Sequence, residues 1–199
     1  MSRASELAFA DREADDKTLF GFWVYLMTDC VLFGSIFATY AVLHNNTYGG
    51  PSGSDLFYLP TVLAETIILL TSSFTCGMAV LAARMNRSRQ LLAWLAVTFL
   101  LGVAFLSLEL NEFHGLVVEG NSWTRSGFLT SFFTLVGTHG LHISIGLIWM
   151  GTMMFKIFKT GLKPANLRQL TMLGLFWHFL DVIWIFIFSM VYLFGGLGL

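Results

Sequence analysis

Five long apolar stretches dominate the sequence and decide what this chain can fold into. A bilayer core of about 30 Å requires about 20 mostly apolar residues per crossing helix. Stretches that meet this requirement lie near residues 20–43, 59–83, 91–113, 128–155 and 170–196. Only 12% of the residues are charged and 56% are hydrophobic, whereas soluble domains carry roughly a quarter charged residues. The sequence therefore predicts an all-α integral membrane bundle of five transmembrane helices.

The polar remainder of the chain divides into a leading segment and short connections. Residues 1–19 are polar and rich in acids and bases, and residues 20–199 contain the five spans. No internal repeat or separate soluble domain is visible, so we expect one transmembrane domain preceded by a short polar segment. The net charge of −1, without a basic patch interleaved with aromatic residues, argues against a nucleic-acid partner.

The basic residues predict how the bundle is oriented. If the chain crosses the membrane five times, ten of its eleven lysines and arginines lie on one side and only Arg125 lies on the other. Basic residues flanking spans are enriched on the cytoplasmic side. We therefore expect a cytoplasmic N-terminus and a C-terminus on the opposite side. The ten residues that share a side are Arg3, Arg12, Lys17, Arg84, Arg87, Arg89, Lys156, Lys159, Lys163 and Arg168.

Ionisable side chains occur inside all five spans, where each costs several kcal/mol unless it has a partner or a task. At about 1.5 Å per residue, Asp29 and four residues of the last two spans come out at similar depth and are predicted to form one layer. The same estimate places Glu109 and Glu112 near the outer edge, within reach of water or headgroups. The eight candidates are Asp29, Glu65, Glu109, Glu112, His139, His142, His178 and Asp181.

Three interpretations of the buried candidates remain open on spacing alone. His139, His142 and His178 are ligands that a stand-alone haem or metal oxidoreductase would use. A buried polar network that fixes helix packing would use the same residue types, and so would a proton relay or a transporter built on Asp29 and Asp181. No zinc, phosphate-loop or di-iron motif favours a sharper assignment. Within the layer we expect Asp181 to pair with His142 or Asp29.

Three long stretches of the sequence are recognisable as those of a known family. They read GFWVYLMTDCVLFGSIFATYAVL at 21–43, SGFLTSFFTLVGTHGLHISIGLIWM at 126–150 and LFWHFLDVIWIFIFSMVYLFGG at 175–196. These stretches resemble subunit III of the haem–copper oxidases, and the five-span length is similar to the short form in bacterial cytochrome bo-type ubiquinol oxidases. The most specific parts are GTHGLH at 137–142 and WHFLDVIW at 177–184.

The resemblance implies an accessory role in a proton-translocating terminal oxidase that oxidises ubiquinol and reduces oxygen to water. On that expectation this chain has no catalytic, cofactor or metal site, and the haems and copper belong to subunit I. The implied partners are subunits I, II and IV and membrane lipid, with phospholipid or quinone as ligands.

The resemblance also implies a place in the cell and a shape. The place is the bacterial inner membrane, with a periplasmic C-terminus, and the shape is a V of two arms in which the first and second spans share one arm. Asp29 falls where the family keeps an embedded carboxylate, usually Glu. A menaquinol or cytochrome c oxidase is the alternative setting for the same subunit.

Overall fold

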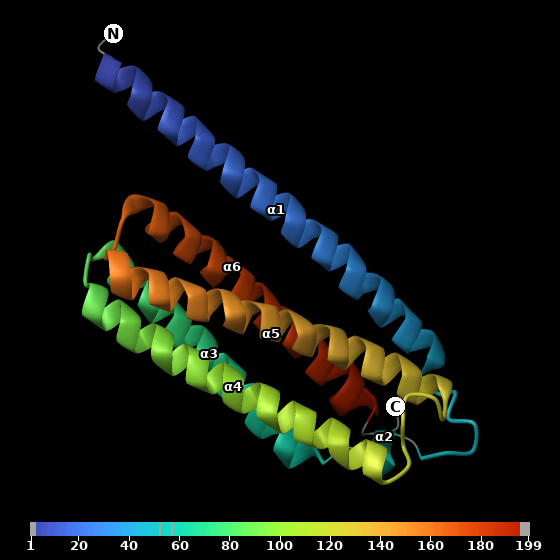
Figure 1. Cartoon of the computed structure of the whole chain (residues 1–199). Coiled ribbons are helices and arrows are strands. Elements are labelled where there is room, and N and C mark those ends of the chain that lie inside the picture. Colours follow the sequence, from blue (N-terminus) through green and yellow to red (C-terminus); the bar gives the residue numbers. More distant parts are fainter. Residues whose placement is uncertain (1–2, 52, 57, 196–199) are drawn as a thin grey trace.

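The computed structural model describes residues 3–51, 53–56 and 58–195, and all regular secondary structure within them is helical (Figure 1). A short turn of helix, α2, lies in the connection before α3, and a π-helix, η1, continues α6 directly. The elements are α1 (Arg3–Leu43), α2 (Gly53–Leu56), α3 (Leu59–Arg84), α4 (Ser88–Val118), α5 (Gly127–Thr160), α6 (Pro164–Ile187) and η1 (Phe188–Phe194).

Five of these helical segments are long and apolar enough to cross a membrane, which confirms the predicted number and order of spans. They are Lys17–Leu43, Leu59–Arg84, Ser88–Val118, Gly127–Thr160 and Asn166–Phe194. The helices of the third and fourth spans, α4 and α5, run several residues past the predicted bounds. A helix formed in lipid extends into polar sequence at little further cost. For the same reason α1 begins at Arg3, so most of the polar segment 1–19 continues the first helix.

The helix ends follow from local sequence signals. Ser126 is the N-cap of α5, and its side chain accepts a hydrogen bond from the Leu129 backbone N–H at 3.2 Å. Pro60 lies in the first turn of α3, where a missing N–H leaves no helical bond unmade. Gly161, at φ +70°, ends α5 in a conformation that favours glycine.

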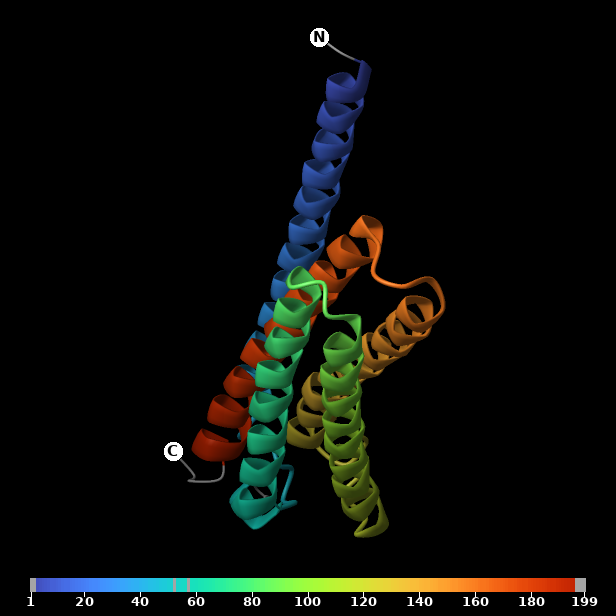
Figure 2. The ribbon, with the colours of Figure 1, turned by 90° about the vertical axis from the view of Figure 1, so that its left-hand side faces the viewer.

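Helices α3, α4, α5 and α6 form a ring in which each helix packs against the next, and α6 closes the ring against α3. Helix α1 packs outside this ring, against α5 and α6 (Figures 1 and 2). The expectation that the first and second spans share one arm is therefore wrong, because the neighbours of α1 are α5 and α6. Hydropathy determines how long a span is, but the neighbours of α1 are determined by the shapes and polar groups on its faces.

The centre of the ring is filled by aromatic side chains of α4 and α6. Trp177 and Trp184 are almost completely buried, and Phe105 packs edge-on against Trp184 at a ring-centroid distance of 4.7 Å. Gly102 makes room for Trp177, since a Cβ at residue 102 would lie 2.9 Å from the indole. This close approach of α4 and α6 is the packing mode that small residues permit in membranes.

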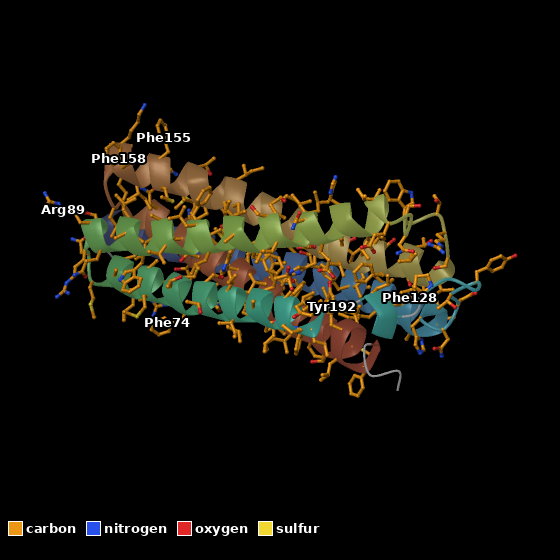
Figure 3. All side chains as sticks on the ribbon, turned by 90° about the horizontal axis from the view of Figure 1, so that it is seen from below. Phe74, Arg89, Phe128, Phe155, Phe158 and Tyr192 are labelled. Carbon is orange, nitrogen blue, oxygen red and sulfur yellow. The ribbon has the colours of Figure 1, made fainter. Side chains whose placement is uncertain are left out.

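The two ends of the bundle differ in chemistry. The start of α1, the α3–α4 turn and the α5–α6 turn lie at one end (Figure 1). Arg89, Phe155 and Phe158 are at this end, while Phe128 and Tyr192 lie toward the other (Figure 3). The helix arrangement therefore gathers the basic connections at one end, as five crossings require.

Candidate functional site

The contact between α1 and α5 contains an acid–imidazole pair. His142 Nε2 lies 3.7 Å from Asp29 Oδ1, and both residues are largely buried. His142 Nδ1 lies 2.7 Å from the Thr138 backbone carbonyl, which can only accept, so Nδ1 carries a proton. The other ring nitrogen faces the carboxyl group, and the contact is an ion pair whenever Nε2 is protonated as well. The pair thus joins the peripheral helix to the ring by electrostatics.

His139 lies one turn away on α5 and has an apolar environment. It is fully buried, and neither ring nitrogen has a hydrogen-bond partner in the described part of the chain. Three aromatic rings enclose it, with centroid distances of 5.3 Å to Trp184, 6.0 Å to Phe105 and 6.5 Å to Phe33. The geometry of His139 is that of an aromatic packing group.

A second polar group forms where α6 meets α3. His178 Nδ1 shares a hydrogen bond of 2.7 Å with Ser73 Oγ and lies 4.0 Å from Asp181 Oδ2. The expectation that Asp181 pairs with His142 or Asp29 is therefore wrong, because Asp29 and His142 pair with each other. No hydrogen bond or ion pair connects the two groups within residues 3–51, 53–56 and 58–195. The prediction of a single polar layer was based on equal depth in the membrane. The residues form two groups because the helix faces that carry them point in different directions.

The glutamates form a third group in the half of the bundle away from the basic end. Glu65 and Glu109 have exposed fractions of 0% and 2%, and Tyr192 donates a hydrogen bond of 3.4 Å to Glu112 Oε2. Glu109 interacts electrostatically with both other glutamates. The expected access of Glu109 to water or headgroups is wrong, because its carboxyl group points inward against Gly140 of α5. Only Glu112 is partly exposed.

Sequence reasoning missed a set of interhelical hydrogen bonds that fix α3 against its neighbours. The Trp177 indole N–H donates to Ser72 Oγ at 3.0 Å, and the Trp184 indole N–H donates to Thr66 Oγ1 at 3.1 Å. Thr75 shares a bond of 2.8 Å with Thr98 of α4. The available signal was the series of hydroxyl residues along the second span opposite two tryptophans seven residues apart. The two indole hydrogen bonds hold α3 against α6, and the threonine bond holds α3 against α4.

The arrangement of the polar groups supports helix packing rather than a shared centre. Within the described residues, no three His, Cys, Asp or Glu side chains are grouped so as to hold a metal ion. The imidazoles of His139, His142 and His178 instead have separate neighbours: aromatic rings, a carboxyl group and a hydroxyl group, respectively. The fold and its polar groups define a polytopic membrane protein whose embedded acids and histidines lie at helix contacts.

Comparison with known proteins identifies the family of this membrane bundle. The model of the family described as cytochrome c oxidase subunit III matches residues 10–196. The chain belongs to the cytochrome c oxidase subunit III family, which confirms the resemblance drawn from the three stretches.

Relatives with different names are similar over nearly their whole length. Cytochrome bo(3) ubiquinol oxidase subunit 3 of Pseudomonas aeruginosa is 58% identical over 185 residues, covering 93% of this chain and 88% of the relative. Quinol oxidase subunit 3 of Bacillus subtilis is 44% identical, covering 94% and 92%. Cytochrome c oxidase subunit 3 of a Bacillus species, strain PS3, is also 44% identical, covering 95% and 91%. These matches do not favour the alternatives of a stand-alone haem or metal oxidoreductase or a transporter.

Proposed function

We propose that the chain is the non-catalytic subunit III of a terminal oxidase that oxidises ubiquinol, reduces oxygen to water and translocates protons. The observation that carries the proposal is the 58% identity, over 93% of this chain, to a subunit named for ubiquinol oxidation. The relative named for cytochrome c is similar at 44%. The higher identity favours ubiquinol over cytochrome c or menaquinol as the electron donor of the complex.

All redox chemistry of the complex would lie in partner subunits, with the haems and copper in subunit I. The surroundings of the three span histidines support this division. His142 is engaged by a backbone carbonyl and Asp29, His178 by Ser73, and His139 is enclosed by aromatic rings. These residues, together with Asp181 and Glu65, would serve as the buried polar network that holds the helices in place.

The chain would lie in the inner membrane of a bacterium, in direct contact with subunit I and in one complex with subunits II and IV. It would place its N-terminus in the cytoplasm and its C-terminus in the periplasm. The basic residues support this orientation, since Arg84, Arg89 and Lys156 lie in the helix turns next to the connections at one end of the bundle, and Lys163 lies in the α5–α6 connection there. Phospholipid or quinone would bind along its membrane-facing surface.

Purification through a tag on this chain tests the proposal directly. We expect a haem-containing subunit to co-purify, a pyridine haemochrome spectrum to report the haems, and the preparation to oxidise ubiquinol with consumption of oxygen. The chain purified alone should give no stoichiometric haem or copper absorption. A haem or copper signal from the isolated chain would refute the non-catalytic role. Oxidation of reduced cytochrome c instead of ubiquinol would refute ubiquinol as the electron donor of the complex.

A further inference from the structure

A groove of about 320 Å³ runs along the membrane-facing side of the α3–α6 contact. Each helix contributes one face of two turns, about 10 Å long at 1.5 Å per residue. The two helices are antiparallel, so Arg84 and Thr171 lie toward the basic end of the groove and Gly77 and His178 toward the middle of the spans. The lining residues are Gly77, Val80, Leu81, Arg84, Thr171, Gly174, Leu175 and His178.

His178 gives this groove a hydrogen-bonding requirement. Its side chain is 45% exposed, although it lies about 18 Å along α6 from Asn166, where the span begins. Ser73 occupies Nδ1, and Nε2 has no partner within the described residues. An unpaired polar group in hydrocarbon costs several kcal/mol. An occupant of the groove that presents a hydrogen-bonding group at this depth would remove this cost.

Arg84 adds a second requirement at the basic end of the groove. Its guanidinium forms no hydrogen bond or ion pair within the described part of the chain, whereas the Thr171 hydroxyl is satisfied by the Leu167 carbonyl at 3.0 Å. An occupant thus meets a cation at the membrane edge and an imidazole about two helical turns deeper. An acyl chain carries no hydrogen-bonding group at the deeper position, whereas a helix repeats side chains on one face at that interval.

We propose that the α3–α6 groove binds a transmembrane helix of a partner subunit, with a hydroxyl or amide side chain against His178 and an acidic side chain against Arg84. Such a helix carries the two side chains about seven residues apart, with the acid at the cytoplasmic edge. A hydroxyl or amide group satisfies Nε2 in either tautomer of His178, because it both donates and accepts. This inference rests on the proposed function, which supplies the partner subunits.

A second groove on the same chain has no charged side chain and no imidazole among the described residues that line it. It lies between α4 and α5, has a volume of about 530 Å³ and includes Phe99, Ile148 and Gly151 in its lining. Its two hydroxyl residues, Ser144 and Thr152, bond carbonyls of their own helix. Lipid chains alone satisfy this groove, so it is the matched control for the α3–α6 groove.

Photo-cross-linking in the purified oxidase complex tests the proposal. Leu81, which lines the groove and is 44% exposed, is replaced by benzoylphenylalanine and the complex is irradiated. We expect an adduct with one partner subunit, identified by mass spectrometry. Gly77→Leu should fill the groove without a clash inside this chain, since a Cβ at residue 77 meets no atom within 4 Å. It should lower the yield of the protein adduct severalfold.

The hydrogen bond is tested by two substitutions of the imidazole in the same photo-cross-linking complex. His178→Phe should lower the adduct roughly three- to tenfold, the change that one interhelical hydrogen bond in a membrane produces. His178→Gln should restore much of the yield, and Gly151→Leu in the control groove should leave it unchanged.

Several outcomes overturn the inference, and each differs from failure of the proposed function. The inference is wrong if Leu81 yields only adducts with phospholipid or quinone, or no protein adduct. It is also wrong if Gly77→Leu leaves a protein adduct intact, or if His178→Phe and His178→Gln behave alike. Failure of the proposed function would appear earlier, as the absence of a haem-containing subunit from the preparation.

Discussion

Helices α1 and α6 both cross the membrane, yet they relate to the rest of the chain in opposite ways. In the most apolar part of each span, 22% of the residues are buried within the chain for α1 and 61% for α6. Helix α6 contributes Trp177 and Trp184 to the centre of the ring, whereas α1 touches it through a narrow face that includes Asp29 and Phe33. The chain therefore stabilises α6 by itself and leaves most of α1 to lipid or other subunits.

The largest expected contrast comes from removing one tryptophan from each helix. Trp177→Ala should lower the free energy of unfolding by about 3 kcal/mol, because it leaves a cavity and removes the hydrogen bond to Ser72. Trp23→Ala on α1 should cost less than about 0.5 kcal/mol, since Trp23 is 46% exposed. Unfolding of the detergent-solubilised chain by SDS, followed by far-UV circular dichroism, measures both. Equal losses would contradict the contrast between the two helices.

A pair of glycine substitutions tests the same contrast by overpacking. The new side chain in Gly102→Val would meet Leu147 and Trp177 at 2.9 Å, and we expect a loss of about 2 kcal/mol. Gly34→Val on α1 meets no atom within 4 Å and should change the stability by less than about 0.5 kcal/mol. The same denaturation measurement applies. A large loss for Gly34→Val would mean that α1 packs against more of this chain than we describe.

A double-mutant cycle isolates the polar link between α1 and the ring. Combining Asp29→Ala with His142→Ala should give a coupling free energy of about 1 kcal/mol, the range found for polar contacts between membrane helices. The cycle that combines Asp29→Ala with His178→Ala serves as the control and should give a coupling near zero, because these residues belong to separate groups. Coupling of similar size in both cycles would support the prediction that these residues form a single polar layer.

The smallest effect concerns the boundary between α6 and its partners. Asp181 lies 4.0 Å from His178, close enough for an electrostatic interaction with this imidazole, which lines the α3–α6 groove. Asp181→Ala should reduce the amount of assembled complex about twofold, measured as haem per membrane protein, and leave turnover per haem unchanged. Asp181→Asn, which keeps the size of the side chain, should assemble normally. Normal assembly of Asp181→Ala together with lost proton pumping would contradict the expectation that this substitution impairs assembly more than activity.

Hydropathy determined the five spans correctly because each span must match the bilayer thickness, a constraint that acts on length alone. The positions of the embedded polar residues could not be obtained in the same way. Depth along a helix places Asp29 and Asp181 together, but their rotation about the helix axes directs them into different groups. Rotation also explains why Glu109 is buried and why the Trp184–Thr66 bond was missed. Both depend on the register between helices, which is set by packing of many side chains at once.

The π-helix at Phe188–Phe194 has a consequence for the side chains that it contains. A wider turn takes up an additional residue, so the side chains within it point in directions that an uninterrupted α-helix would not give them. The phenol of Tyr192 reaches Glu112 from within this wide turn. Wound as an uninterrupted α-helix, at about 100° per residue, the segment would point the Tyr192 phenol in another direction. The winding of the backbone, as much as the identity of the residue, aims Tyr192 at the carboxyl group.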